Sequence, residues 1–186
     1  QQAEAAERIK QSEKSRTFYE QALKIPAKNL EERKKQKEIL SFLSEGDLQE
    51  KIQAEDWAGI SKQIRSESQS GLRPLNQKNF DLLVYAETQQ KNWSGVLSAF
   101  ELKKSRDPSS VNTLTALLIQ AEAAEKLNEP MRARTFYRKA LKVAPRNQEE
   151  RRRQQEIEKF LSEEQLQKKI ENQDWQGIVA QIHKEV

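Results

Sequence analysis

Apolar side chains recur along the chain at intervals of three and four residues. Between residues 113 and 127 the apolar positions are Leu114, Leu117, Leu118, Ala121 and Ala124. From Pro130 onward they are Ala133, Phe136, Tyr137, Ala140 and Leu141. Such spacing places the apolar residues on one face of a helix. No segment alternates strictly between apolar and polar residues, as a half-buried strand does. The pattern therefore predicts an all-α fold.

Several short signals predict where helices begin and end. Asn128-Glu129-Pro130 marks a turn and a new helix, which we expect Pro145 to end because its ring clashes with the preceding turn. Asp107-Pro108 is typical of an N-cap followed by proline in the first turn. Residues 162–165 (Ser-Glu-Glu-Gln) fit a capping box, which predicts a further helix start there, and residues 44–47 are a weaker counterpart.

The chain contains a long internal duplication. Residues 2–67 match residues 120–185 without a gap at an offset of 118, and about 35 of the roughly 66 aligned positions are identical. The two copies should therefore share one fold. Because the chain begins and ends inside this period, and begins with Gln1, we expect it to be part of a longer protein with further copies.

A shorter motif occurs three times: Asp or Asn is followed directly by Trp, and Gly is the second residue after the Trp. It is Asp56-Trp57-x-Gly59, Asn92-Trp93-x-Gly95 and Asp174-Trp175-x-Gly177. Trp93 follows Trp57 by 36 residues, close to the period of about 34 residues of a helix–turn–helix repeat. The residue before each tryptophan looks like a helix N-cap.

These residues resemble the tetratricopeptide repeat (TPR) family. In residues 114–147, Leu117 and Ala121 fall on the fourth and eighth positions of that repeat. Ala133, Tyr137, Ala140 and Pro145 fall on the twentieth, twenty-fourth, twenty-seventh and thirty-second. The resemblance implies a right-handed α-solenoid, a superhelix of antiparallel helix pairs whose concave face binds peptides or partner proteins. It assigns a structural role to Trp57, Gly59, Trp93, Gly95, Trp175, Gly177, Ala121, Ala133, Tyr137, Ala140 and Pro145.

The resemblance divides the chain into sub-repeats within one continuous helical array over residues 1–186. Their approximate bounds are 1–28, 41–74, 77–110, 114–147 and 159–186. Residues 29–43 and 147–161 depart from the repeat, and we interpret each as an extra helical segment. Each begins acidic and turns basic, which suits the helix dipole.

Basic residues concentrate in two corresponding stretches, although the formal net charge is only +4. Residues 132–153 hold many more Lys and Arg than acidic residues, and residues 14–37 are similar. The candidate partner-binding residues are Arg132, Arg138, Arg146, Arg151, Arg152 and Arg153, with Arg33, Lys34 and Lys35 in the first copy. They suit an acidic protein or peptide or an anionic polysaccharide. A solvated helix face explains the same pattern, and nucleic acid is disfavoured because no nucleic-acid motif is present.

Two other groups of residues have a functional and a structural interpretation. Trp57, Trp93 and Trp175 form either an aromatic ladder for a ligand or, as their regular spacing favours, packing positions at helix starts. Gln120, Glu122 and Glu125 either face a ligand groove or lie on an exposed helical edge.

The composition offers little for catalysis. The chain has no cysteine and one histidine, His183, for which the sequence provides no catalytic partner. No phosphate-binding loop, HExxH or GxSxG motif occurs, so we predict no enzyme, no metal site and no cofactor. No apolar run approaches the about 18 residues of a membrane span. Periplasm and cytoplasm are both compatible with this composition.

Three functional hypotheses follow. The first is a non-catalytic scaffold for protein–protein interaction or assembly. The second is a periplasmic TPR module of a bacterial exopolysaccharide or surface-polymer export machine, which guides an anionic polymer or recruits a modifying enzyme. The third is a self-assembling repeat module.

Overall fold

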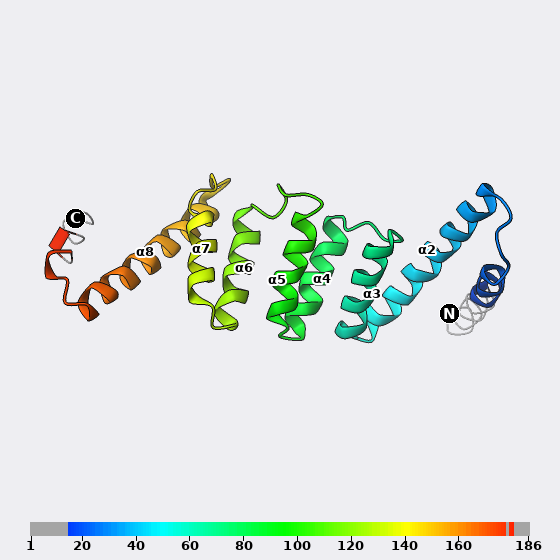
Figure 1. Cartoon of the computed structure of the whole chain (residues 1–186), viewed down its shortest axis with the longest axis horizontal. Coiled ribbons are helices and arrows are strands. Elements are labelled where there is room, and N and C mark those ends of the chain that lie inside the picture. Colours follow the sequence, from blue (N-terminus) through cyan, green and yellow to red (C-terminus); the bar gives the residue numbers. More distant parts are fainter. Residues whose placement is uncertain (1–14, 178, 181–186) are drawn as a thin grey trace, which may run out of the picture. The chain divides into compact units, whose positions relative to one another are not determined.

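A computed structural model describes residues 15–177 and 179–180, and all regular structure in this part is helical, which confirms the all-α prediction. Residues 15–23 form a helix. The later helices are α2 (Leu30–Gln53), α3 (Trp57–Ser70), α4 (Gln77–Gln89), α5 (Trp93–Lys104), α6 (Leu114–Lys126), α7 (Pro130–Ala140) and α8 (Gln148–Glu171) (Figure 1). The chain forms two compact units, unit 1 (residues 1–92) and unit 2 (residues 93–186).

In unit 1, α3 packs against both α2 and α4. Its side chains Ile60 and Ile64 are fully buried, and Leu48 of α2 and Leu83 of α4 are buried as well. Ile60 and Ile64 are four residues apart and so lie on one face of α3. Burial of side chains of this size contributes about 2 kcal/mol each, so this face of α3 is the centre of the unit 1 core.

In unit 2, α6 packs against α5 and α7, and α7 packs against α8. Phe100 of α5 and Leu114 of α6 are buried. Ala121 of α6 is also buried, as are Ala133 and Ala140 of α7, and none of the three is more than 2% exposed. Small side chains at these positions let two helix backbones approach closely.

Four helices end in the same kind of turn. The next-to-last residue of each turn has a left-handed backbone, with φ of 52°, 55°, 57° and 56° at Glu55, Lys91, Asn128 and Gln173. In each turn the following backbone N–H donates to a carbonyl five residues earlier, as in the bond of 2.9 Å from Asp56 to Lys51. Only Asn128 is a residue type that often adopts this conformation. The recurrence of one turn agrees with the repeats in the sequence.

Asparagine caps begin the two longest helices. The side chains of Asn29 and Asn147 accept hydrogen bonds of 2.8 Å from the backbone N–H groups of Glu32 and Glu150. Each glutamate carboxylate in turn accepts a bond of 2.7 Å from the backbone N–H of the residue before the asparagine. Together they satisfy backbone donors that a helix start leaves unpaired. Sequence reasoning placed no cap at these positions.

The predicted helix start at Ser162 is wrong, because α8 runs through it without a break. The weaker counterpart at residues 44–47 likewise lies inside α2. A capping pattern starts a helix only where the preceding segment ends, and residues 148–161 contain no Gly or Pro to end it. The segments interpreted as extra helices form the first parts of α2 and α8.

Two proline predictions also need correction. Asp107-Pro108 does not start a helix, since α6 begins at Leu114 with Thr113 as its N-cap. The Asp107 carboxylate instead accepts hydrogen bonds from Ser109 and Ser110 in a turn, and these bonds lower its pKa. Helix α7 ends at Ala140, well before Pro145. Pro145 therefore lies beyond the end of the helix and does not mark it.

A buried arginine ties the helices of unit 1 together. Arg73, which is 7% exposed, donates to Glu67 and to Glu45 at 2.7 Å and to the Ser44 hydroxyl at 2.8 Å. Gln63 donates to Glu67 at 2.8 Å. Burial on its own would raise the pKa of Glu67, but the hydrogen bonds from Arg73, Ser44 and Gln63 outweigh it and lower that pKa. The network joins α2 and α3 to the segment that follows α3.

We expect Arg73→Ala to lower the free energy of unfolding by about 3 kcal/mol, because the carboxylate of Glu67, whose side chain is only 13% exposed, loses its cation. Urea denaturation followed by circular dichroism measures the change. Arg33→Ala, on the exposed start of α2, is the control and should change stability by less than about 0.5 kcal/mol. The contribution of Glu67 should be present above its unfolded pKa of about 4.5 and disappear as the pH falls through the lower native pKa. Equal effects of the two variants would contradict the role of the network.

Candidate docking groove

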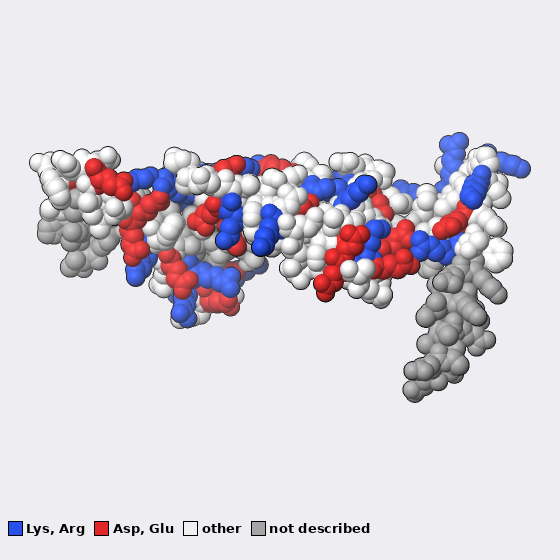
Figure 2. Space-filling view, turned by 90° about the horizontal axis from the view of Figure 1, so that it is seen from below, with Lys and Arg blue, Asp and Glu red and all other residues white. Residues whose placement is uncertain are grey.

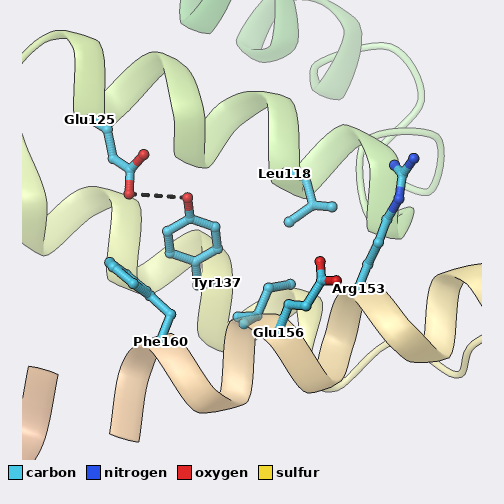
Figure 3. Close-up of a pocket in the computed structure, with 7 residues that line it drawn as sticks. Leu118, Glu125, Tyr137, Arg153, Glu156 and Phe160 are labelled. Carbon is cyan, nitrogen blue, oxygen red and sulfur yellow. Dashed lines mark hydrogen bonds between the residues drawn. The ribbon is translucent and has the colours of Figure 1, made fainter. Parts of the chain in front are cut away.

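A groove of about 450 Å³ lies between α6, α7 and α8 in unit 2 (Figure 3). It is lined by Leu118, Glu125, Tyr137, Arg153, Glu156, Ile157 and Phe160. Volumes of this size are typical of sites that take up a small ligand or a few side chains of a peptide. Its apolar lining comes from Leu118, Tyr137, Ile157 and Phe160.

Helical spacing brings the lining residues to one place. Leu118 and Glu125 are two turns apart on α6 and so share a face. On α8, Arg153, Glu156 and Phe160 follow at steps of three and four residues. Tyr137 projects from α7 into the space between them (Figure 3). The groove therefore depends on residues 153–160 forming one uninterrupted stretch of helix.

An aromatic pair closes one end of the groove. The rings of Tyr137 and Phe160 meet edge to face, with centroids 5.8 Å apart and planes at 65°. The phenol of Tyr137 donates a hydrogen bond of 3.0 Å to Glu125. Phe160 is 47% exposed, although large aromatic side chains usually bury more of their surface. This end thus combines an exposed ring with a carboxylate.

Burial raises the pKa of Tyr137 to about 12, assisted by the negative charges of Glu125 and Glu122. Both carboxylates therefore act on the aromatic end of the groove. Within the described residues no Lys or Arg forms an ion pair with Glu125. The aromatic end consequently carries negative charge that no cation of the described chain neutralises.

Charges at the other end of the groove are paired along α8. Arg153 pairs with Glu149 at 2.7 Å, and Glu156 pairs with Arg152 at 3.4 Å. These side chains are at least half exposed, so the pairs contribute little to stability. They do balance charge locally, which leaves the aromatic end as the part of the groove with a distinct electrostatic character.

The structure does not gather the predicted basic residues into one site. All nine of them are exposed: Arg132, Arg138, Arg146, Arg151, Arg152, Arg153, Arg33, Lys34 and Lys35. Arg132, Arg152, Arg153 and Lys35 form ion pairs with a glutamate three or four residues away. On the face shown in Figure 2, Lys and Arg are interspersed with Asp and Glu. Of the nine, only Arg153 lines the groove described above.

The tryptophans begin helices or helical turns. Trp57 is half-buried and meets Tyr85 edge to face at 5.2 Å, Trp93 is half-buried, and Trp175 is 64% exposed. The Asp56 and Asp174 carboxylates accept bonds from the N–H groups of Gly59 and Gly177 at 2.8 and 2.9 Å. A Cβ atom on either glycine would lie about 2 Å from that carboxylate. The motif is thus a helix cap in which glycine makes room for the capping acid.

The structure separates the three polar residues that were considered together on α6. Gln120 faces neither a ligand nor solvent, since it is 6% exposed and donates to the carbonyl of Ala116 at 3.0 Å. Glu122 is exposed, and Glu125 lines the groove. Gly95 is buried, and Pro145 is exposed in the segment after α7. Residues 2–7, which match residues 120–125 at the offset of 118, lie outside the described residues, and so does His183.

Within the described residues, no group of three or more Asp, Glu, His or Cys side chains could hold a metal ion. No helix in the same part of the chain is sufficiently long and apolar to cross a membrane.

Sequence reasoning missed most of the groove. Phe160, Ile157 and Glu156 were not considered as site residues, and Tyr137 was considered only for packing. Phe160 and Tyr137 are identical to Phe42 and Tyr19 at the offset of 118. An aromatic residue that is repeated but does not fall on the buried face of its helix is the signal that would have identified the site.

The high pKa of Tyr137 can be measured in a variant with Tyr19→Phe and Tyr85→Phe, which leaves it as the only tyrosine. We expect ultraviolet titration of the phenolate to give a pKa of about 12. Glu125→Gln should lower it, because a negative charge next to the phenolate is removed. Stability due to neutral Tyr137 should be full below pH 10 and decline as the pH rises from about 10 to 12. A pKa near 10 in protein that circular dichroism shows to be folded would contradict the geometry.

Neither protein-family models nor curated proteins nor solved structures give a match to this chain. What the groove binds must therefore be inferred from its own shape and charge.

Proposed function

We propose that the chain is a non-catalytic protein–protein interaction module whose groove between α6, α7 and α8 binds a segment of a partner protein. The observation that carries this proposal is the exposed ring of Phe160 above Tyr137 and Glu125. A phenylalanine that is 47% exposed contributes less to folding than a buried one, whereas an aromatic side chain in an apolar groove is a typical binding hot spot.

The chemistry of the groove favours a partner segment in which Lys or Arg adjoins an apolar side chain. Leu118 and Ile157 provide apolar surface for the apolar side chain. The faces of Tyr137 and Phe160 attract a cation, and the carboxylate of Glu125 neutralises it. An acidic segment would instead meet the negative charge of Glu125 and Glu122 without compensation. Charge complementarity thus selects a basic segment for this groove.

We further propose that the helices are of TPR type and form pairs in a right-handed superhelix. The residues that support this are those of segment 114–147 that match the TPR pattern, such as Ala121, Ala133 and Ala140, all of which are buried. The recurring turn at the ends of four helices also supports it. A scaffold of such pairs would hold α6 and α7 rigidly while α8 completes the groove.

Selection from a library of random 12-residue peptides on the immobilised chain tests the groove. We expect enriched peptides to contain Lys or Arg next to an apolar residue. Phe160→Ala should weaken their binding at this groove at least about tenfold, equivalent to about 1.4 kcal/mol. Glu125→Gln should weaken it less and reduce its dependence on salt, because the lost interaction is electrostatic.

Ile170→Ala provides the matched control for the peptide selection. Ile170 is on the same helix, is 43% exposed and does not line the groove. It should leave peptide affinity unchanged, and all variants should retain their circular dichroism spectrum. Enriched peptides that bind the Phe160→Ala and Ile170→Ala variants with the same affinity and the same stoichiometry would place the site elsewhere.

A second candidate function is the binding of an acidic partner by the basic residues. What favours it is that Arg138, Arg146 and Arg151 are exposed and form no ion pair within the described residues. Their charges therefore remain available to a partner, whereas Arg152 and Arg153 already pair with glutamates of α8. This surface is separate from the acidic end of the groove and would require a partner of opposite charge.

Charge reversal tests this basic surface. With poly-glutamate as the probe, we expect Arg138→Glu, Arg146→Glu and Arg151→Glu together to weaken binding roughly tenfold, from about 0.5 kcal/mol per exposed pair. The control variant carries Lys62→Glu, Lys78→Glu and Lys91→Glu, which makes the same change in net charge in unit 1. If the control loses as much affinity, poly-glutamate responds to net charge and the assignment fails.

A further inference from the structure

The aromatic pair of the groove is repeated in unit 1. Tyr19, on the helix formed by residues 15–23, meets Phe42 of α2 edge to face. The ring centroids are 5.6 Å apart and the planes are at 68°, against 5.8 Å and 65° for Tyr137 and Phe160. Phe42 is 64% exposed, and Tyr19 is 39% exposed. The same two residue types thus form the same exposed pair in both copies.

Matching polar contacts hold the two helices together in each copy. The side-chain amide of Gln36 on α2 donates to the carbonyl of Ile25 at 2.6 Å, and Gln154 on α8 donates to that of Val143 at 2.7 Å. Gln154 and Val143 are the counterparts of Gln36 and Ile25 at the offset of 118. The aromatic pair is therefore placed by the same local structure in each copy.

Arginines at matching positions add a second contact of this kind. Arg16 forms ion pairs with Asp47 and Glu50 of α2, and its counterpart Arg134 forms one with Glu164 of α8. In both copies an arginine of the helix that precedes α2 or α8 thus forms ion pairs with the second half of that long helix. With contacts on both sides of the aromatic pair, the exposure of its phenylalanine is a consequence of the fold of each copy.

The lining of the groove is retained between the copies more completely than the rest of the duplication. Tyr137, Glu156, Ile157 and Phe160 correspond to identical residues, namely Tyr19, Glu38, Ile39 and Phe42. Glu125 corresponds to Glu7, which lies outside the described residues, and Arg153 to Lys35, which keeps the charge. Only about half of all aligned positions are identical.

Packing explains only part of this retention. Ile157 is buried and Ile39 is half-buried, so an apolar residue is required there for folding. Phe42 is 64% exposed and Phe160 47% exposed, so burial requires an aromatic ring at neither position. Their identity in both copies points to a role outside the fold, and the shared Tyr, Glu, Ile and Phe side chains of the described parts point to the same kind of partner.

We propose that the helix of residues 15–23 and α2 carry a second docking site of the same class, so that the chain binds two basic, apolar segments of one kind, one in each unit. This proposal rests on the function proposed for the groove in unit 2. Two equivalent sites in one chain would raise the affinity for a partner that carries two such segments, because the second binding step becomes intramolecular.

Isothermal titration calorimetry of the full chain with the most enriched 12-residue peptide tests the proposal. We expect a stoichiometry of two peptides per chain. Phe42→Ala alone and Phe160→Ala alone should each reduce it to one, and the double variant should bind none. Leu40→Ala, on the same helix as Phe42 and 43% exposed, is the control and should keep two sites.

A stoichiometry of one that Phe160→Ala abolishes and Phe42→Ala leaves unchanged would overturn the second site while sustaining the function proposed for unit 2. Peptide binding that neither variant alters would contradict both the function proposed for unit 2 and the second site. Because Phe42→Ala removes only a largely exposed side chain, its circular dichroism spectrum should match that of the unmodified chain. Phe42→Arg serves as a second variant, since its positive charge should repel the basic peptide and also give a stoichiometry of one.

Discussion

The helical backbone of the first part of α8, from Gln148 to Leu161, is the constraint on which the candidate site depends. A break between Arg153 and Phe160 would release Phe160 from the face that it shares with Arg153 and Glu156. The asparagine cap at Asn147 starts the helix, and the absence of Gly and Pro keeps it intact. Helix α2 obeys the same constraint from Asn29 onward, although Gly46 lies within it and weakens it by about 1 kcal/mol.

These long helices are attached to their neighbours by little apolar surface. Only Ile157 and Leu161 of α8 are buried, which contributes a few kcal/mol against the conformational entropy of a long helix. Polar contacts supply the rest: Gln154 binds carbonyls at the end of α7, and Arg134 pairs with Glu164. A helix held along one narrow strip leaves its other side chains available, which is why Phe160 is exposed. The same weak attachment makes the groove a surface feature and not part of a core.

The sequence allowed the local structure to be predicted better than the site. Helical periodicity predicted α6 and α7, and the acid before tryptophan predicted the cap at Asp56, because both depend on neighbours in sequence. The cap at Asn147 was missed because its motif has asparagine where the usual box has serine or threonine. The Arg73 network and the groove join residues that are far apart in sequence, so no local pattern predicts them. The basic stretch, by contrast, predicted a binding site that the structure does not bring together. Residues adjacent in sequence point to different sides of a helix, and Arg152 and Arg153 pair with nearby glutamates.

In the proposed docking function, the choice of partner depends on where charges are held more than on their number. The nine basic residues considered for binding are exposed, so water and salt screen them and each contributes little to discrimination. Glu125 is itself exposed, but it accepts a hydrogen bond of 3.0 Å from a half-buried phenol whose pKa burial raises to about 12. This bond holds the carboxylate beside the rings of Tyr137 and Phe160. In the proposed docking function, one positioned carboxylate beside two aromatic rings therefore distinguishes a basic from an acidic segment more sharply than arginines on the open faces of α7 and α8.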